Sequence, residues 1–303
     1  MTLKQALRRA RGILAENNVE DAPLECELLL RHALGISQTQ LYLDFDNELS
    51  PEPGAAFWRL IERRLSGEPT AYITGHREFY GLDFYVDPRV LIPRPESELL
   101  VEEALSLAQN RSLFTIADIG TGSGAIAISL ALSLPEAKIY ATDISAAALE
   151  VARLNCRRHG VIDRIHLLPG NMLEPVPEPI DLIVANLPYV KKSQLAGMKF
   201  EPWLALDGGA DGTERIRQLC RQVDSKLRPG GFFLLEIGQG QRRAVTALLH
   251  DLFPGGKMEV MLDLSGIDRV ISFSPTNRLS NLTHNSDTAK LVSWAFTSRL
   301  GKQ

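Results

Sequence analysis

The feature that most constrains the fold is an alternation of short apolar, strand-like segments with helix-like segments between about residues 114 and 274. Such an alternation is typical of a doubly wound, mainly parallel sheet with helices on both faces. The strand-like segments are FTIADIG, KIYATDI, RIHLLPG, IDLIVANLPY, GGFFLLEIG, KMEVMLDL and DRVISFS. The sequence therefore predicts an α/β fold with a seven-stranded sheet, whose ligands bind at the carboxyl ends of the strands.

The first 75 residues show helical periodicity instead. Apolar residues recur at the spacing of one helix face: Leu3, Leu7, Ala10 and Leu14. Asp21 precedes a second helical segment and is expected to cap it. This part of the chain has no candidate catalytic cluster, so we expect residues 1–75 to form a small helical bundle that docks a substrate or covers the other domain.

Two connecting regions complete the expected organisation. Residues 76–94 alternate large apolar and polar side chains around Gly81, which is typical of a β-hairpin. This hairpin is expected to link the bundle to a catalytic domain over residues 95–274. Residues 275–303 are polar apart from one short apolar run, and the sequence assigns this tail no role.

Composition excludes several classes of protein. Of the 303 residues, 45% are hydrophobic and 23% are charged, as in soluble globular proteins, and the basic N-terminus lacks the continuous apolar block of a signal peptide. A net charge of -4 argues against indiscriminate binding of nucleic acid. The widely spaced Cys26, Cys156 and Cys220 indicate neither a disulfide framework nor a zinc site. We expect a cytoplasmic protein with reduced thiols that contacts no membrane, metal or nucleic acid directly.

A glycine-rich loop follows the first strand of the expected sheet. ADIGTGSGAIA places Gly120, Gly122 and Gly124 before a helix, where missing side chains let a ligand lie against the backbone. Asp143 ends the next strand, where a carboxylate can accept both hydroxyls of a ribose. Together they predict a nucleoside site. Because Gly120, Gly122 and Ala125 also satisfy a dinucleotide fingerprint, the loop alone does not choose the nucleoside.

The fourth strand of the sheet runs into Asn186, Leu187, Pro188 and Tyr189. The Asn186 side chain offers one carbonyl acceptor, the Leu187 peptide offers another, and the Tyr189 ring, expected to be exposed, can stack on a flat group. Two acceptors that converge on one NH2 group hold it and favour pyramidalisation, which returns electron density to a delocalised nitrogen. The segment predicts transfer of an electrophilic carbon to a planar nitrogen, with alignment as the main catalytic device. Hydride transfer needs no such clamp, so methyl transfer from S-adenosyl-L-methionine is favoured over a nicotinamide dehydrogenase.

These residues resemble a known family. DIGTGSGAIA, Asp143 and NLPY are similar to class I S-adenosyl-L-methionine-dependent methyltransferases, with a Rossmann-like fold, that modify planar nitrogens. Over roughly residues 1–273 the chain resembles the release factor glutamine methyltransferases (the PrmC/HemK family), most clearly in EPTAYITGHREFYGLDFYVDPRVLIPRPESELLVEEAL, FEPWLALDGGADGTERIRQL and LRPGGFFLLEIGQGQ. The resemblance implies methylation of the glutamine side-chain amide in the Gly-Gly-Gln motif of peptide chain release factors.

The resemblance also implies roles for individual residues. The residues that would bind the cofactor are Gly120, Thr121, Gly122, Ser123, Gly124, Asp143, Met172 and Asn186. The residues that would grip the glutamine are Asn186, Leu187, Pro188 and Tyr189, and those that would line the substrate entrance are Pro93, Arg94 and Pro95. A proline-rigid linker before a helix is equally compatible with the last three. The chain departs from the family pattern at Met172, where an aromatic residue is common, at Asn171, where an acid is usual, and at Leu187, where the family has proline.

Two other functions stay open at this stage. One is methylation of a ribosomal-protein glutamine or of adenine N6 in nucleic acid, and the acidic balance weighs against the nucleic-acid version. The other is a non-catalytic nucleoside-binding protein that has lost its chemistry through Leu187.

Overall fold

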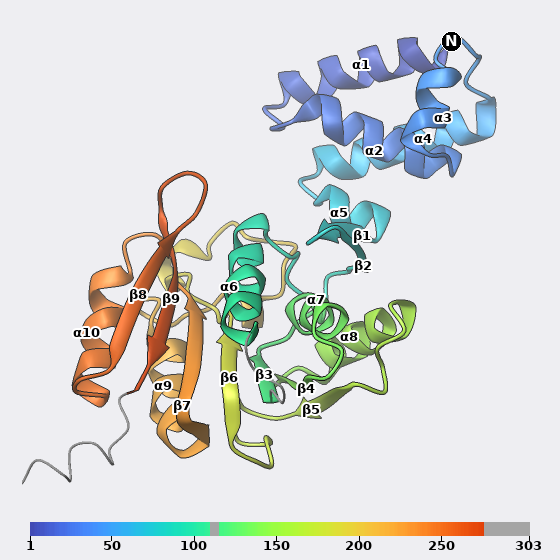
Figure 1. Cartoon of the computed structure of the whole chain (residues 1–303). Coiled ribbons are helices and arrows are strands. Elements are labelled where there is room, and N and C mark those ends of the chain that lie inside the picture. Colours follow the sequence, from blue (N-terminus) through green and yellow to red (C-terminus); the bar gives the residue numbers. More distant parts are fainter. Residues whose placement is uncertain (110–114, 276–303) are drawn as a thin grey trace, which may run out of the picture.

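The computed structural model describes residues 1–109 and 115–275. A bundle of helices lies beside an α/β part, and a small hairpin lies between the two (Figure 1). Residues 276–303, nearly all of the expected tail, lie outside the described residues. Over the part of the chain that is described, no helix is long and apolar enough to cross a bilayer.

The N-terminal bundle consists of α1 (Leu3–Glu16), α2 (Ala22–Leu34), α3 (Gln38–Leu43), α4 (Pro51–Leu65) and the short α5 (Thr70–Thr74). α1 buries Leu3, Ala6, Ala10 and Leu14, so the expected apolar face is shifted slightly, with Leu7 only partly buried. The prediction that Asp21 caps α2 with its side chain is wrong: Asp21 has a left-handed backbone and makes no side-chain cap hydrogen bond. Pro23 lies in the first turn, which preorganises the helix start instead.

The hairpin pairs β1 (His76–Phe79) with β2 (Leu82–Tyr85) around the expected turn at Gly81. Asn155 of α8 (Ala146–Arg158) fastens this hairpin to the α/β part. Its Oδ1 accepts the Tyr85 N–H at 2.8 Å, and its Nδ2 donates to the carbonyl oxygens of Tyr85, at 3.0 Å, and Ser123, at 2.8 Å. The fully buried Asn155 therefore joins the hairpin to the glycine loop that contains Ser123.

The sheet confirms the expected fold class. Its seven strands run in the order β5-β4-β3-β6-β7-β9-β8, and all neighbours are parallel except at β9. The strands are β3 (Thr115–Ile119), β4 (Lys138–Asp143), β5 (Ile165–Pro169), β6 (Ile180–Ala185), β7 (Leu227–Glu236), β8 (Lys257–Leu262) and β9 (Asp268–Ser274). The order reverses between β3 and β6, which is the position where doubly wound sheets bind ligands.

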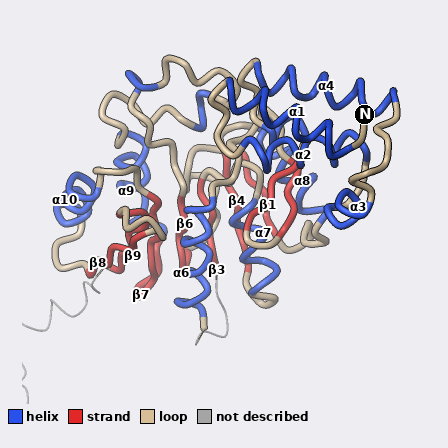
Figure 2. The backbone as a smooth tube through the Cα atoms, turned by 90° about the horizontal axis from the view of Figure 1, so that it is seen from above, coloured by secondary structure: helices blue, strands red, loops and turns tan. Residues whose placement is uncertain are grey.

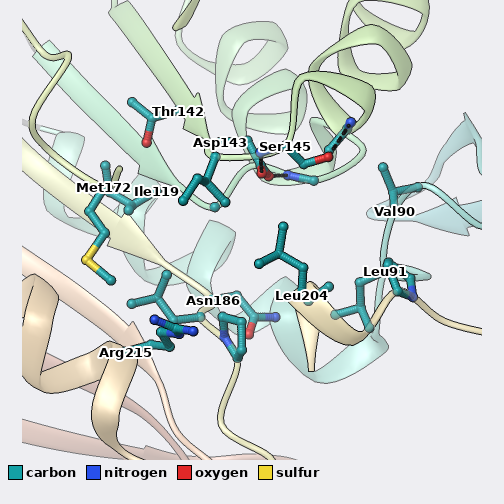
Figure 3. Close-up of a pocket in the computed structure, with 18 of the residues that line it drawn as sticks. Val90, Leu91, Ile119, Thr142, Asp143, Ser145, Met172, Asn186, Leu204 and Arg215 are labelled. Atoms are coloured by element: carbon teal, nitrogen blue, oxygen red, sulfur yellow. Dashed lines mark hydrogen bonds between the residues drawn. The ribbon is translucent and has the colours of Figure 1, made fainter. Parts of the chain in front are cut away.

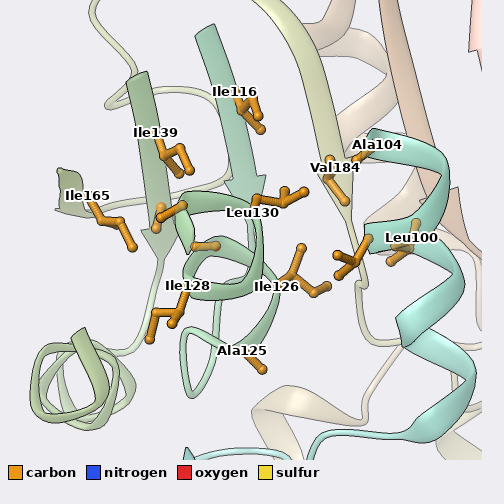
Figure 4. Packing of buried hydrophobic residues seen from close by; sticks show 14 of the residues in the cluster. Leu100, Ala104, Ile116, Ala125, Ile126, Ile128, Leu130, Ile139, Ile165 and Val184 are labelled. Carbon is orange, nitrogen blue, oxygen red and sulfur yellow. The ribbon is translucent and has the colours of Figure 1, made fainter. Parts of the chain in front are cut away.

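Helices cover both faces of this sheet (Figures 1 and 2). One face packs against α6 (Glu98–Ala108), α7 (Ala125–Ser133) and α8, and the other packs against α9 (Glu214–Lys226) and α10 (Arg242–Leu252). Strand alternation divides the side chains of β6 between the two cores: Val184 joins the first, near α6 and α7 (Figure 4), and Ile183 joins the second. Both faces of β6 are thus buried, which fixes the position of the residues that follow it.

Three short 3-10 helices complete the described elements: η1 (Pro95–Ser97), η2 (Lys192–Gln194) and η3 (Trp203–Ala205). Cys26, Cys156 and Cys220 are free and buried, as expected for reduced thiols. Burial raises the thiol pKa to about 12 for Cys26, about 11 for Cys156 and about 12 for Cys220. These thiols are therefore protonated and unreactive near neutral pH.

Candidate active site

A cavity of about 330 Å³ lies at the carboxyl ends of β3, β4 and β6 (Figure 3). The predicted site residues that line it are Gly120, Gly122, Asp143, Met172, Asn186, Leu187 and Pro188. These residues come from segments far apart in the sequence, and the parallel strands bring them to one edge of the sheet. The structure therefore places the glycine loop, the acid after β4 and the first three residues of the NLPY segment around one cavity, whereas Tyr189 does not line it.

The glycine loop needs its glycines for backbone geometry and for close packing. Gly120, Gly122 and Gly124 have φ angles of 73°, 55° and 83°, a region that side chains disfavour. The N–H groups of Gly120 and Thr121 both donate to the Thr142 carbonyl at 2.9 Å, which turns the loop across the end of β4. A Cβ on Gly124 would lie 3.3 Å from the Ala152 Cβ of α8. The loop is thus held close to the sheet, with its backbone toward the cavity.

Asp143 closes this loop from the neighbouring strand. Its Oδ2 accepts the Gly122 N–H at 3.0 Å, and its Oδ1 accepts the Ser145 N–H at 2.8 Å. Burial raises the pKa of Asp143, and these backbone donors oppose that effect. Each carboxylate oxygen keeps a further lone pair, so the side chain can still accept two hydroxyl groups.

Asp118 braces the same loop from beneath. It is buried at the end of β3, and it accepts the Thr121 hydroxyl at 2.7 Å. Burial raises its pKa to about 6. Thr121, Ser123 and Gly124 belong to the loop without lining the described cavity, so direct contact between these three and a cofactor stays a prediction.

Thr142 supplies an independent sign that the cavity receives a polar ligand. Its Oγ1 is one of the buried side-chain oxygens or nitrogens without a hydrogen-bond partner in the described part of the chain, and the residue lines the cavity. A buried hydroxyl without a partner costs about 1–3 kcal/mol. A polar group in the cavity would relieve that cost, so the residues present fit a nucleoside-containing cofactor.

Met172 gives the cavity an apolar end. It is largely buried and adopts a φ of 53°, unusual for a residue with a side chain. Beside it, Asn171 donates from Nδ2 to Glu174 Oε1 at 2.8 Å, which leaves its own Oδ1 as an acceptor. An adaptable apolar side chain next to an amide oxygen can take a heteroaromatic base with an exocyclic amine, even though both residues depart from the family pattern.

The NLPY segment leaves β6 under tight restraint. Asn186 donates from Nδ2 to Ser97 Oγ at 2.8 Å. The carbonyl of Tyr189 accepts from Gln241 Nε2 at 3.1 Å, and the Val190 N–H donates to the Leu206 carbonyl at 3.0 Å. These bonds hold both ends of the segment at the cavity edge.

Two side chains of this segment turn inward. The expectation of an exposed Tyr189 ring is wrong: the ring is half-buried, and its hydroxyl donates to Glu236 Oε1 at 3.1 Å. Burial, followed by the adjacent Glu236 charge, raises the pKa of Tyr189, so the phenol stays protonated. Leu187 is buried in the second core, and its Cδ2 would lie 3.4 Å from a Cβ on Gly120. Leu187 therefore supports the glycine loop with its side chain.

The residues Pro93, Arg94 and Pro95 do not line the cavity among the described residues, whereas the preceding Val90 and Leu91 do. Arg94 pairs with Glu201 at 2.5 Å, and the Pro93 carbonyl accepts from Arg77 at 3.1 Å. The segment thus ties the hairpin to the long loop between β6 and α9. A role for it at the substrate entrance stays a prediction.

Sequence reasoning missed several residues of the site. The cavity is also lined by Arg89, Pro202, Leu204, Ala205 and Arg215. Arg89 and Pro202 lie outside the helices and strands, Leu204 and Ala205 belong to the short η3, and Arg215 lies in the first turn of α9, so no apolar periodicity marks them. Glu236 did carry a signal, because a carboxylate that ends an apolar strand at the ligand-binding edge is the same pattern that identified Asp143.

Comparisons with known proteins agree with this geometry. Residues 5–75 match the family described as the PrmC N-terminal domain, and residues 95–201 match the methyltransferase small domain. The catalytic domain of hMettl16 in complex with the MAT2A 3'UTR hairpin 6 shares the fold with a TM-score of 0.55 at 15% identity, over 66% of this chain and 77% of that one. A methyltransferase from Pyrococcus furiosus has a TM-score of 0.50 at 20% identity, over 65% and 91%. Fold and site thus define a class I methyltransferase.

Curated relatives narrow the class. The release factor glutamine methyltransferase of Moorella thermoacetica is 45% identical over 274 residues, which cover 89% of this chain and 97% of that protein. The one from Geobacter sulfurreducens is 41% identical over 281 residues, which cover 89% and 95%. The chain belongs to the family of release factor glutamine methyltransferases.

Proposed function

We propose that this protein transfers the methyl group of S-adenosyl-L-methionine to the side-chain amide nitrogen of the glutamine in the Gly-Gly-Gln motif of peptide chain release factors, in the cytoplasm. The observation that carries this proposal is the position of Asn186. Its side chain lies at the edge of the nucleoside cavity, and its NH2 group is engaged by Ser97. The amide oxygen is thereby left as an acceptor for a substrate N–H.

The cofactor would be held by residues already placed around the cavity. The backbone of Gly120 and Gly122 would contact its methionine part, Asp143 would accept the ribose hydroxyls, and Met172 would cover the adenine. When bound, S-adenosyl-L-methionine supplies an electrophilic methyl group on a sulfonium.

The protein's own contribution is to hold the substrate nitrogen. Asn186 Oδ1 and the Leu187 carbonyl would each accept one N–H of the glutamine amide. This holds the amide plane and favours the lone pair needed for attack. The half-buried Tyr189 ring would stack against the amide while its hydroxyl stays bonded to Glu236. Such alignment removes much of the entropic cost of bringing two reactants together.

The helical bundle of residues 1–75 would dock the release factor, and residues 95–274 would carry the chemistry. Support comes from apolar side chains that α2 and α3 expose: Leu24, Leu28, Tyr42 and Leu43. Exposed apolar groups gathered on neighbouring elements are typical of protein-binding surfaces.

The test is incubation of the purified protein with methyl-labelled S-adenosyl-L-methionine and a purified release factor, followed by peptide mass spectrometry. We expect one methyl on the glutamine of the Gly-Gly-Gln motif. Asn186→Ala should abolish transfer while cofactor binding, measured by calorimetry, is largely kept. Label on a ribosomal protein but not on the release factor, in a parallel incubation with purified ribosomal proteins, would favour another glutamine substrate, and binding without any transfer would favour a non-catalytic protein.

A further inference from the structure

We propose that Ser97 and Glu236 are positioning residues, which fix the Asn186 amide through a hydrogen-bonded chain so that its oxygen faces the substrate nitrogen. The inference deepens the proposed function and rests on it. It concerns two residues that do not line the described cavity and that act through Asn186 and, for Glu236, also through Tyr189.

The chain joins three elements of the fold. Asn186, after β6, donates from Nδ2 to Ser97 Oγ at 2.8 Å, and Ser97, in η1, donates to Glu236 Oε2 at 2.5 Å. The other oxygen of Glu236 accepts the Tyr189 hydroxyl at 3.1 Å. Glu236 ends β7, the strand beside β6 (Figure 1). Ser97 is 3% exposed and Glu236 is 1% exposed, so water does not compete for these bonds.

Counting protons fixes the direction of the chain. Ser97 donates its single proton to Glu236 Oε2 and Tyr189 donates to Glu236 Oε1, so both oxygens of this carboxyl group accept hydrogen bonds, as those of an ionised carboxylate do. Ser97 can then only accept from Asn186, and the group of Asn186 that faces it must be the NH2. Asn186 Oδ1 consequently points the other way, and it accepts no hydrogen bond from any described residue.

The negative charge of an ionised Glu236 sets which groups donate and which accept along the hydrogen-bonded chain. The groups around Glu236 stabilise that charge. Burial raises the pKa of Glu236, whereas hydrogen bonds from Ser97 and Tyr189 and the positive charge of Arg269 on β9 oppose that rise. Glu96 of η1 adds a weaker effect that raises the pKa. A buried carboxylate is costly to keep, and a neutral amide of the same shape would suit folding better. We infer that the carboxylate is kept for the site.

A Glu236→Gln substitution tests this direction. The Tyr189 hydroxyl would donate to the oxygen of the new amide, whose NH2 would then face Ser97. Ser97 would accept that bond and turn its proton toward Asn186, which would present its carbonyl to Ser97 and its NH2 to the substrate. The change keeps the shape of the side chain but reverses the chain of donors.

We expect Glu236→Gln and Ser97→Ala each to lower kcat for methyl transfer roughly 10- to 100-fold. This is the loss expected when the hydrogen bond between Asn186 Oδ1 and the reacting nitrogen is no longer made in the transition state. Ser97→Thr keeps the hydroxyl and should retain most of the rate. Affinity for S-adenosyl-L-methionine, measured by calorimetry, should be nearly unchanged. The Tm of Glu236→Gln at pH 7.5 should not fall, because burial disfavours the charged form of Glu236 and a neutral amide of the same shape avoids that cost.

Glu103→Gln is the matched control. Glu103 of α6 also accepts a serine hydroxyl, from Ser272 at 3.3 Å, and burial also raises its pKa. Glu103 has no link to Asn186, so this substitution should leave kcat unchanged.

A second readout does not depend on turnover. The side-chain NH2 of Asn186, observed by NMR, should exchange with solvent slowly in the wild-type protein and at least about tenfold faster in Ser97→Ala. Equal exchange in both proteins would overturn the proposal, as would a Glu236→Gln variant with wild-type kcat or a Ser97→Thr variant no better than Ser97→Ala. If the wild-type protein transfers no methyl group yet shows slow exchange that Ser97→Ala accelerates, the proposed function fails and the positioning role stands.

Discussion

Gly208 offers a sharp test of whether alignment is the main catalytic device, because it packs against the backbone of the NLPY segment and does not line the cavity. A Cβ on Gly208 would lie 2.7 Å from the Tyr189 Cα and 2.8 Å from the Pro188 and Gly212 carbonyl oxygens. All three neighbours are backbone atoms, so no side chain can turn away. The Gly208 N–H also donates to the Val190 carbonyl at 2.9 Å, which keeps the two segments together.

The size of the effect follows from these distances. Ordinary contact begins at 3.4 Å, so the backbone of Pro188 and Tyr189 must retreat by about 0.6–0.7 Å, the difference from 2.8 and 2.7 Å. Overpacking of this kind lowers the free energy of unfolding by about 1–3 kcal/mol. A shift approaching 1 Å in a positioning group can cost about 100-fold in rate, so we expect Gly208→Ala to lower kcat about 10- to 100-fold.

Gly231→Ala is the matched control. Its Cβ would meet the Asp181 and Arg228 carbonyl oxygens at 2.8 and 3.0 Å and Leu227 Cδ1 at 2.9 Å, a similar clash, midway along β7 and outside the residues that line the cavity. Urea unfolding should show comparable losses of stability for both variants. Single-turnover methyl transfer, measured well below both Tm values, should fall only for Gly208→Ala. Wild-type turnover in Gly208→Ala, or an equal loss in both variants, would refute the argument from alignment.

Three further predictions use the same assays. Leu187→Pro should leave kcat similar or higher, because the Leu187 N–H donates no hydrogen bond within the described chain; a large loss would show that the site is built differently. Asp118→Asn should remove a pH dependence of stability: because the pKa is raised from 3.8 to about 6, wild-type stability is highest at low pH and falls by about 3 kcal/mol in total as pH rises through about 6, with about 1.4 kcal/mol of that loss between pH 5 and 7.5. An equal change in the free energy of unfolding between pH 5 and 7.5 for both proteins, measured by urea unfolding, would contradict this. Arg94→Gln should raise KM for the release factor several-fold with unchanged cofactor affinity, and an unchanged KM would favour the linker role.

The sequence predicts the sheet well because a buried parallel strand is a nearly continuous apolar segment that can be recognised locally. Val184 and Ile183 face opposite cores, so β6 is apolar apart from Asp181 near its start, and this run can be recognised without knowing its neighbours. The end of such a strand is equally recognisable. Asn186 and Asp143 could therefore be placed at one edge of the sheet from the sequence alone.

Other features depend on contacts that no local pattern records. Asp21 has the residue type of a helix cap, but its backbone is left-handed and its side chain makes no cap hydrogen bond. The Tyr189 ring looked exposed because its partner, Glu236, is 47 residues away in the chain. Ser97 lies 139 residues from Glu236 and 89 from Asn186, so only the folded sheet edge brings the three together. The sequence identifies the NLPY segment as a candidate but does not identify the side chains that hold it.

The same supports explain how the site tolerates leucine at position 187. Proline restricts its own φ and the conformation of the residue before it, so the chain lacks one source of rigidity at Asn186. Here the restraint comes from hydrogen bonds. Ser97 fixes the Asn186 side chain, Gln241 holds the Tyr189 carbonyl, and Leu206 accepts the Val190 N–H. These bonds come from three different segments. Loss of any one bond should therefore raise the mobility of the NLPY backbone more in this protein than in a relative with two prolines. For the same reason, Leu187→Pro should partly restore the kcat that a Gln241→Ala variant loses.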